Sequence, residues 1–336
     1  MRWDEQGVRV DDGALPGLDR TAFVRSVRTP QFDGITFHEV LCKSALNKVP
    51  HAAALPFQYT VNGYRGCSHA CRYCFARPTH EYLDFNSGSD FDTQVIVKTN
   101  VTDVLRRELS RRSWCRETVA LGTNTDPYQR AEGRYVLMPG IIGALAESGT
   151  PLSILTKGTL LRRDLPLIAD AAKQVPVGVS VSLAVGDAEL HERVEPGTPG
   201  PKARLALITA IREAGLECHV MVAPVLPYLT DSVEHLDDLL GEIAAAGANG
   251  VTVFGLHLRG STRGWFMSWL SQTYPHLVGR YRELYRRGAY LPPSYRDELR
   301  AKAAPLIAKH RLAGDRRRLD VGKPQCVAGT VQPTLF

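Results

Sequence analysis

Cys67, Cys71 and Cys74 lie in one short segment, Tyr64-Arg-Gly-Cys-Ser-His-Ala-Cys-Arg-Tyr-Cys-Phe-Ala-Arg77, with three residues between the first pair and two between the second. Clusters of four irons that only transfer electrons take a thiolate on each iron. Three thiolates at this spacing can hold three irons and leave the fourth without a protein ligand. An iron of that kind can bind a substrate or a cofactor.

Two other interpretations of the three cysteines have to be weighed. Structural zinc, with His69 or His80 as a further ligand, is one, but zinc ribbons normally bring a second pair of ligands and we see none in this sequence. A disulfide framework is the other, and an odd count of 7 cysteines in 336 residues argues against it. We therefore expect a 4Fe-4S cluster on Cys67, Cys71 and Cys74.

The cysteine segment resembles the signature of the radical S-adenosylmethionine (SAM) superfamily. That resemblance implies that SAM binds the open iron through its amino and carboxylate groups and is cleaved reductively to a 5'-deoxyadenosyl radical. It also implies an external electron donor, similar to flavodoxin or ferredoxin, as a partner. The protein is then expected to be an enzyme whose radical acts on an unidentified substrate.

A second segment with polar and flexible residues follows the predicted strand Thr118-Val-Ala-Leu-Gly122. A glycine at a strand end allows the backbone to approach a ligand closely. The resemblance implies that Gly122, Thr123 and Asn124 bind the SAM amino group through main-chain carbonyls, although Gly-Gly-Glu is the more common form of this element. Asp126 and Tyr128 come next, and Asp126-Pro127 is equally a turn signal.

Two further strand ends offer groups for SAM. Lys157 directly follows the predicted strand 152–156. The resemblance implies that it contacts the SAM carboxylate; a lysine exposed to solvent beside a turn is the alternative. The next predicted strand alternates strictly, so Ser180 and Ser182 share one face. Either serine can bond the SAM ribose or carboxylate, or simply fill a narrow interior.

Other candidates have weaker support in the sequence. Cys218 and Cys326 can donate a hydrogen atom to a product radical, but inert buried cysteine is the more common case. His219 is more often a wall residue of a strand than a catalyst. A loop rich in proline and charge contains Arg193, Glu195 and Arg204, for which we expect a network of contacts over the cofactor.

These residues need elements to position them, and short apolar runs alternate with amphipathic segments along the chain. We predict strands near 58–62, 118–122, 152–156, 177–183, 218–223 and 250–255, with helices between them, for example over 101–109 and 202–212. Strands joined by crossover helices form a parallel sheet of the α/β class. The resemblance implies a partial (β/α)6 barrel, similar to a TIM barrel, with the cysteines after its first strand.

Domain boundaries follow from this pattern. We predict an irregular N-terminal extension over residues 1–55, because breakers such as Pro16, Pro30 and Gly34 interrupt it. The barrel core is expected over 56–260, and a helical C-terminal cap and tail, rich in tryptophan and tyrosine, over 261–336.

Composition excludes few classes of function. No apolar stretch is long enough to span a membrane, and reduced cysteines suit the cytoplasm, so we expect a cytoplasmic protein without membrane contact. The net charge is +6, and arginines cluster at 106–107, 111–112, 280–287 and 316–318. Such groups can bind nucleic-acid phosphates, or they can be solvated helix faces that form ion pairs with nearby glutamates.

Several segments together resemble the spore photoproduct lyase-like group of this superfamily: 47–50, 64–77, 123–129, Thr156-Lys157 and 193–199. The lyase of that group splits a thymine dimer with the help of a cysteine beside the second strand. Here Ala120-Leu-Gly-Thr-Asn124 has no cysteine, which argues against dimer-lyase activity. A nucleic-acid repair enzyme and a nonenzymatic iron–sulfur or zinc module remain as alternatives, and the sequence does not identify a substrate.

Overall fold

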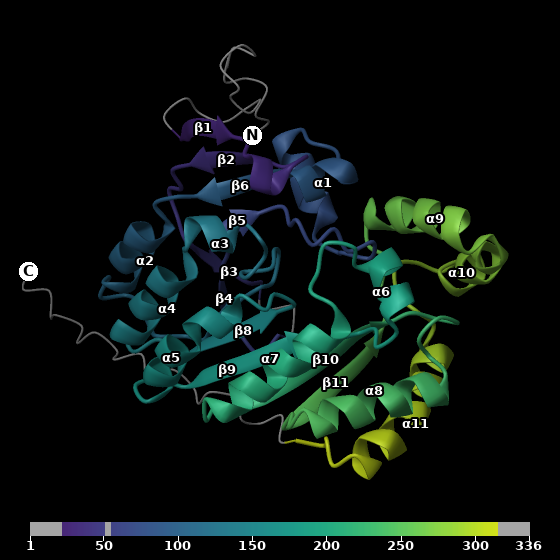
Figure 1. Cartoon of the computed structure of the whole chain (residues 1–336). Helices are drawn as coiled ribbons and strands as arrows, with labels where there is room; N and C mark the ends of the chain where they lie inside the picture. Colours follow the sequence, from purple (N-terminus) through teal and green to yellow (C-terminus); the bar gives the residue numbers. More distant parts are fainter. Residues whose placement is uncertain (1–21, 51–54, 315–336) are drawn as a thin grey trace, which may run out of the picture.

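The computed structural model describes residues 22–50 and 55–314 (Figure 1). Its larger sheet has the strand order β11-β10-β9-β8-β7-β4-β3, with β11 and β3 at the two edges of a sheet that does not close. Six strands run parallel: β4 (Tyr59–Val61), β7 (Val119–Leu121), β8 (Leu152–Thr156), β9 (Val177–Ser182), β10 (Cys218–Val225) and β11 (Gly250–Gly255). Strand β3 (Leu46–Lys48) joins antiparallel to β4. The six predicted strands and the partial barrel are thus confirmed.

Six helices cover the outside of this sheet (Figure 1): α2 (Val101–Leu109), α4 (Met138–Glu147), α5 (Leu161–Ala172), α7 (Pro201–Glu213), α8 (Val233–Ala245) and α11 (Pro293–Lys309). Leu105, Ile141 and Leu207 of these helices are buried in one apolar core with the strand residues Val179 and Val181. The predicted helices over 101–109 and 202–212 are confirmed. The alternation predicted for β9 is present, because Val179 and Val181 are buried in the core that the strands share with the helices.

The N-terminal part differs from our expectation. Strands β1 (Phe23–Val27), β2 (Thr36–Val40), β6 (Gln94–Lys98) and β5 (Tyr64–Arg65) form a second sheet in the order β1-β2-β6-β5. The prediction of irregular structure over 1–55 is therefore wrong for the described residues 22–50. Every residue of β2 is buried, and its polar side chains find partners, so the period of two that marks a half-exposed strand is missing from its sequence.

The C-terminal part is helical, as predicted, but it divides between two cores. Helices α9 (Thr262–Thr273) and α10 (Val278–Leu284) pack with α6 (Ala188–Val194) in a second apolar cluster that contains Phe266 and Tyr281. Helix α11 instead buries Leu299 and Leu306 in the barrel core, so it is the last helix of the barrel rather than part of a cap.

Short elements complete the description: α1 (Ser89–Thr93), α3 (Glu132–Tyr135) and the 3-10 helices Pro30–Phe32, Arg77–Leu83 and Pro275–Leu277. Among the helices that the structure describes, none is both long and apolar enough to cross a membrane.

Candidate functional site

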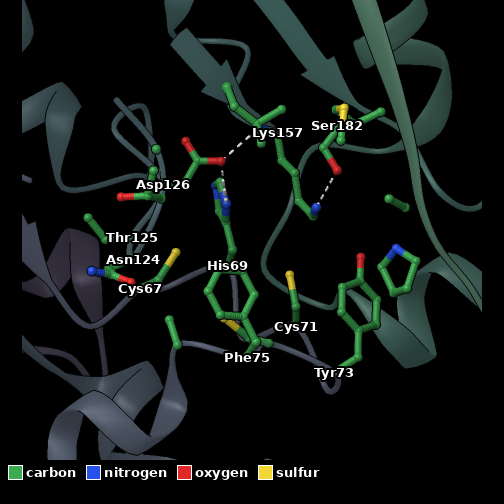
Figure 2. A pocket seen from close by; sticks show the side chains of 18 of the residues that line it. Cys67, His69, Cys71, Tyr73, Phe75, Asn124, Thr125, Asp126, Lys157 and Ser182 are labelled. Atoms are coloured by element: carbon green, nitrogen blue, oxygen red, sulfur yellow. Dashed lines mark hydrogen bonds and ion pairs between the residues drawn. The ribbon is translucent and has the colours of Figure 1, made fainter. Parts of the chain in front are cut away.

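A pocket opens where the parallel strands of the larger sheet end, which is where ligands bind in this type of fold. Figure 2 shows side chains from several strand ends and from the cysteine segment pointing into it. Its wall is formed by Cys67, His69, Cys71, Tyr73, Cys74, Phe75, Ala76, Gly122, Thr123, Asn124, Thr125, Asp126, Leu155, Thr156, Lys157, Ser182, Met221, Ala223, Pro224, Phe254, Leu256 and His257.

Cys67, Cys71 and Cys74 all line this pocket as free cysteines. Among the described residues, no three His, Cys, Asp or Glu side chains form a group that could hold a single metal ion. An iron–sulfur cluster takes one thiolate per iron, and the three thiols border one space. Burial raises the pKa of Cys74 to about 11 and that of Cys71 well above its usual value, and a bound cluster would supply the positive charge that keeps them ionised. The donor set fits a cluster.

The segment 123–129 holds the cysteine loop from one side. The Thr125 hydroxyl donates to the Gly66 carbonyl at 2.7 Å, and the Gln129 amide donates to the same oxygen at 3.1 Å. The Gln129 side chain also accepts from the Ser68 N–H at 2.9 Å. Gln129 is fully buried, so these bonds are shielded from water.

The last residue of α6 and the loop after it hold the cysteine loop from the other side. The Gly197 N–H donates to the His69 carbonyl at 3.1 Å, and the Arg72 N–H donates to the Val194 carbonyl at 2.9 Å. A Cβ atom at Gly197 would lie 2.1 Å from the Ser68 carbonyl oxygen, so only glycine allows this approach. The glycine of the 193–199 segment therefore has a packing role that the sequence did not show.

Arg77 supports the end of the cysteine segment, a role that sequence analysis missed. Its fully buried guanidinium donates to the Cys71 carbonyl at 2.9 Å and pairs with Asp92 at the same distance. It also lies over the Trp265 ring, 4.7 Å from the centroid. A buried arginine that bonds a main-chain carbonyl gives no periodic signal in a sequence.

Gly122 sits where β7 ends, with φ of +95°. A Cβ atom there would lie 2.0 Å from the Leu155 carbonyl oxygen, so glycine allows the backbone of β8 to come this close. The close approach of Gly122 to a ligand stays a prediction. Gly122, Thr123 and Asn124 all line the pocket. Asn62 accepts from the Asn124 N–H at 3.3 Å and so fixes this turn.

Asp126 joins three parts of the site. Its carboxylate accepts from the Thr156 hydroxyl at 2.5 Å and from the Lys157 N–H at 2.6 Å, and it lies 3.4 Å from Nδ1 of His69 (Figure 2). Burial by itself raises the pKa of Asp126, but His69 and the hydrogen bonds lower it below its usual value. Asp126 is thus an ionised carboxylate, and more than a turn residue. Tyr128 donates its N–H to Asp126 and does not line the pocket.

Lys157 points into the pocket (Figure 2), so its position differs from that of a solvent-facing lysine. Its ammonium donates to the Ser182 hydroxyl at 2.5 Å and lies 3.8 Å from the Glu195 carboxylate. Glu195 also accepts hydrogen bonds from Tyr73 and Arg204. The expected network around Glu195 and Arg204 is present.

Other predicted residues lie elsewhere. Ser180 faces the barrel interior below the pocket and does not line it, whereas Ser182 does. Arg193 points outward to Glu189 and Tyr274 and is not part of the Glu195 network. His219 bonds Thr252 and is a wall residue, as expected. Cys218 begins β10, fully buried in the core and at the opposite end of the strand from the pocket, while Cys326 lies outside the described residues.

The other half of the pocket is apolar, and sequence analysis did not identify it. Met221, Ala223 and Pro224 come from β10, and Phe254, Leu256 and His257 come from the end of β11. The Phe75 ring lies 5.7 Å from that of His257. Burial, together with the Arg259 charge, lowers the pKa of His257, so this wall is uncharged near neutral pH.

Comparison with known proteins shows which family this chain resembles in sequence. The sequence model of the radical SAM superfamily matches residues 61–240. The protein Rv2578c of Mycobacterium tuberculosis and the protein Mb2609c of Mycobacterium bovis are each 79 % identical over 343 aligned residues, covering all of both chains. The protein MJ0683 of Methanocaldococcus jannaschii is 26 % identical over 239 residues, covering 70 % of this chain and 83 % of its own.

Solved structures agree on the fold. A mutant of spore photoproduct lyase superposes with a TM-score of 0.61 at 16 % identity, covering 82 % of this chain and 79 % of the lyase. Another mutant of the lyase, with bound AdoMet and dinucleoside spore photoproduct, superposes with the same TM-score and identity and covers 81 % and 78 %. At this identity the likeness shows a shared fold and leaves the activity of this chain to its own residues.

Proposed function

Since this chain belongs to the radical SAM superfamily, we propose that it is an enzyme that holds a 4Fe-4S cluster on Cys67, Cys71 and Cys74 and cleaves SAM reductively. The observation that carries this proposal is the shared pocket. The same space is lined by three free cysteines and by Lys157, which follows a strand far from them in the sequence. When bound, the cluster supplies the electron that cleaves SAM to methionine and a 5'-deoxyadenosyl radical.

The chain's own groups provide separate contacts for each end of SAM. Lys157 offers an ammonium to the carboxylate, because its tip lies in the pocket and donates only to Ser182 at hydrogen-bond distance. The main chain at Gly122–Asn124 offers carbonyls for the amino group, and Gly122 keeps that backbone free of a side chain. Ser182, rather than Ser180, is the serine in reach of the ligand.

The substrate would meet the apolar half of the pocket, which contains Phe75, Met221, Phe254 and Leu256. Phe75 and Phe254 are 46 % and 42 % exposed, so a bound substrate has to cover them to exclude water. Exclusion of water protects a reactive radical from side reactions. The three cluster cysteines are the only thiols among the described residues that line the pocket. An external electron donor similar to flavodoxin or ferredoxin completes the proposal.

The test is anaerobic reconstitution of the full chain with iron and sulfide. The wild type should show a 4Fe-4S spectrum and form 5'-deoxyadenosine from SAM when dithionite is present. Cys67→Ala, Cys71→Ala and Cys74→Ala should each lose the cluster, because each removes a ligand. Cys218→Ala is the matched control and should keep both cluster and cleavage.

Two results would overturn the proposal. An intact wild-type cluster that neither binds nor cleaves SAM would reject the enzyme. About one zinc and no sulfide in anaerobically purified protein would favour the structural zinc module instead.

A further inference from the structure

Glu195 occupies an unusual position for a carboxylate, since it is fully buried and surrounded by donors and cations. Tyr73 and Arg204 donate hydrogen bonds to it, and the Thr198 hydroxyl donates at 3.3 Å. Lys157 lies at 3.8 Å and the His191 ring nitrogen at 3.7 Å. A buried carboxylate destabilises the fold unless hydrogen bonds and nearby cations satisfy its oxygens. Tyr73, Thr198 and Arg204 supply these hydrogen bonds to Glu195.

The contacts of Glu195 join two parts of the site that are far apart in sequence. Tyr73 lies between Cys71 and Cys74, and its hydroxyl ties the cysteine loop to the carboxylate. Lys157 comes from the end of β8, and its ammonium also lies 5.7 Å from the centroid of the Tyr73 ring. One carboxylate therefore contacts the loop that carries the thiols and the lysine that faces the ligand.

Arg204 competes with Lys157 for the Glu195 carboxylate and is the partner that is hydrogen-bonded to it. Arg204 is fully buried and bonds Glu195 directly, as well as the Ser182 and Pro199 carbonyls at 2.9 Å each. Glu195 is thus already paired. Lys157 stays outside hydrogen-bond distance of it, so the ammonium keeps hydrogen-bonding capacity for an incoming carboxylate while its long stem is confined.

We propose that Glu195 is a positioning residue that holds Lys157 and the cysteine loop in a fixed relation, so that SAM can meet the lysine and the cluster at the same time. This inference rests on the proposed function of the pocket. A buried Glu195–Arg204 pair that serves stability alone is the competing explanation, and the two differ in what happens to SAM binding.

The first experiment is a double-mutant cycle on the reconstituted protein, with the SAM dissociation constant measured by anaerobic titration calorimetry. Glu195→Gln and Lys157→Met should each weaken SAM binding about tenfold or more. The double variant should bind SAM more weakly than either single variant but less weakly than the product of the two effects, because Glu195 acts partly through that lysine and partly through the cysteine loop. Effects that multiply in the double variant would overturn the proposal. Glu189→Gln, an exposed position on the preceding helix, is the control and should bind like the wild type.

A second variant protects the test against misfolding of Glu195→Gln. Tyr73→Phe removes only the hydroxyl that joins the cysteine loop to Glu195 and leaves the Arg204 pair in place. Iron content should match the wild type, and the thermal unfolding midpoint should fall by only a few degrees, because one donor to a buried carboxylate is lost. SAM affinity should fall several-fold, and the SAM-induced change in the electron paramagnetic resonance spectrum should be altered. Wild-type SAM binding and spectra in Tyr73→Phe would overturn the proposal. Failure of the wild type itself to bind SAM would instead reject the function on which the inference rests.

Discussion

At the scale of single residues, Asp126 is the side chain that connects most of the pocket. It accepts from Thr156 and from the Lys157 and Tyr128 backbones, and it faces His69 of the cysteine loop. Three of these contacts are hydrogen bonds to the carboxylate, whose side chain is 10 % exposed on the pocket wall. Asp126 therefore sets the backbone direction from which Lys157 enters the pocket.

Replacement of Asp126 by Asn tests this role. The amide keeps the shape but loses one acceptor oxygen and the charge that faces His69, so the free energy of unfolding should fall by about 2–4 kcal/mol. Urea unfolding of the apoprotein measures the loss. Asp170→Asn, whose carboxylate is exposed in an ion pair with Lys173, should change stability by less than about 0.5 kcal/mol. Equal stabilities of the two variants would contradict the connecting role of Asp126.

Residue types and spacing predicted the pocket's polar half well. Lys157 and Ser182 could be found because each stands at the carboxyl end of a strand, and the three cysteines because of their spacing. All five line the pocket, while their roles stay predictions. Depth along a strand was harder to judge. Ser180 has the same face as Ser182 but lies two residues further from the strand end, and the sequence pattern does not measure that difference.

At the scale of elements, the cysteine loop is clamped between two other loops. Segment 123–129 bonds Gly66 and Ser68, the loop after α6 bonds His69, and the last residue of α6 bonds Arg72. The second clamp has no room for a side chain at Gly197, because the Ser68 carbonyl is so near. Loop geometry, rather than helix or strand packing, therefore sets the positions of the thiols.

Gly197→Ala tests the clamp. The new methyl group has to push the Ser68 carbonyl away, so we expect a loss of about 1–3 kcal/mol in stability and a lower iron content after reconstitution. The control is Gly200→Ala in the same loop, where a Cβ atom meets nothing within 4 Å. Iron per chain and the urea midpoint should be close to wild type in that control. A Gly197→Ala protein that loads iron as well as Gly200→Ala would show that the clamp does not position the thiols.

The Glu195 network makes a prediction about pH. Burial alone raises the pKa of Glu195, but Arg204, Lys157 and Tyr73 lower it from 4.5 to about 2. The folded protein therefore holds this proton more weakly than the unfolded chain does. The resulting stability, of the order of 3 kcal/mol, is present above pH 4.5 and is lost as the pH falls towards 2.

Unfolding of the apoprotein in urea at a series of pH values measures this contribution. The difference in stability between wild type and Glu195→Gln should narrow as the pH falls below 4.5, the ordinary value of a glutamate. Glu189→Gln should differ from the wild type by a small amount that stays the same across that range. A constant difference for Glu195→Gln would contradict a lowered pKa.

Strands and helices were predicted correctly where one hydrophobic period dominated the sequence. They were missed where buried polar residues hid that period. The six parallel strands are apolar runs between amphipathic helices, and all six were found. Strands β2 and β6 were missed because β2 has buried polar residues on both faces and β6 follows a stretch without periodicity. Helix α11 was assigned to a cap because its sequence does not reveal that it packs on β11 and the barrel.

At the scale of the whole molecule, the described arginine clusters lie on the outer helices α2 and α10 and in the turns that follow them, and none of these arginines lines the pocket. Arg106 is on α2 and pairs with Glu147 at 3.6 Å, and Arg286 pairs with Glu283 at 3.1 Å. Such pairs are typical of solvated helix faces. We therefore expect duplex DNA to bind weakly and without preference for sequence.

Filter binding at two salt concentrations tests that expectation. Retention of DNA by the full chain should fall at least about tenfold between roughly 50 and 200 mM salt, because only phosphate contacts contribute. Heparin should compete as well as DNA of any sequence. Tight binding at the higher salt that distinguishes damaged from intact DNA would revive the repair enzyme as the better explanation.

The two loops that clamp the cysteine loop have a consequence for the lifetime of the protein. Their bonds join main chain to main chain or to Gln129 and Thr125, and none of them passes through a thiol. If oxygen destroyed the cluster, the cysteine loop would therefore keep its position. We expect this protein to be reloaded with iron and sulfide without unfolding, so that one chain can outlast many copies of its own cofactor.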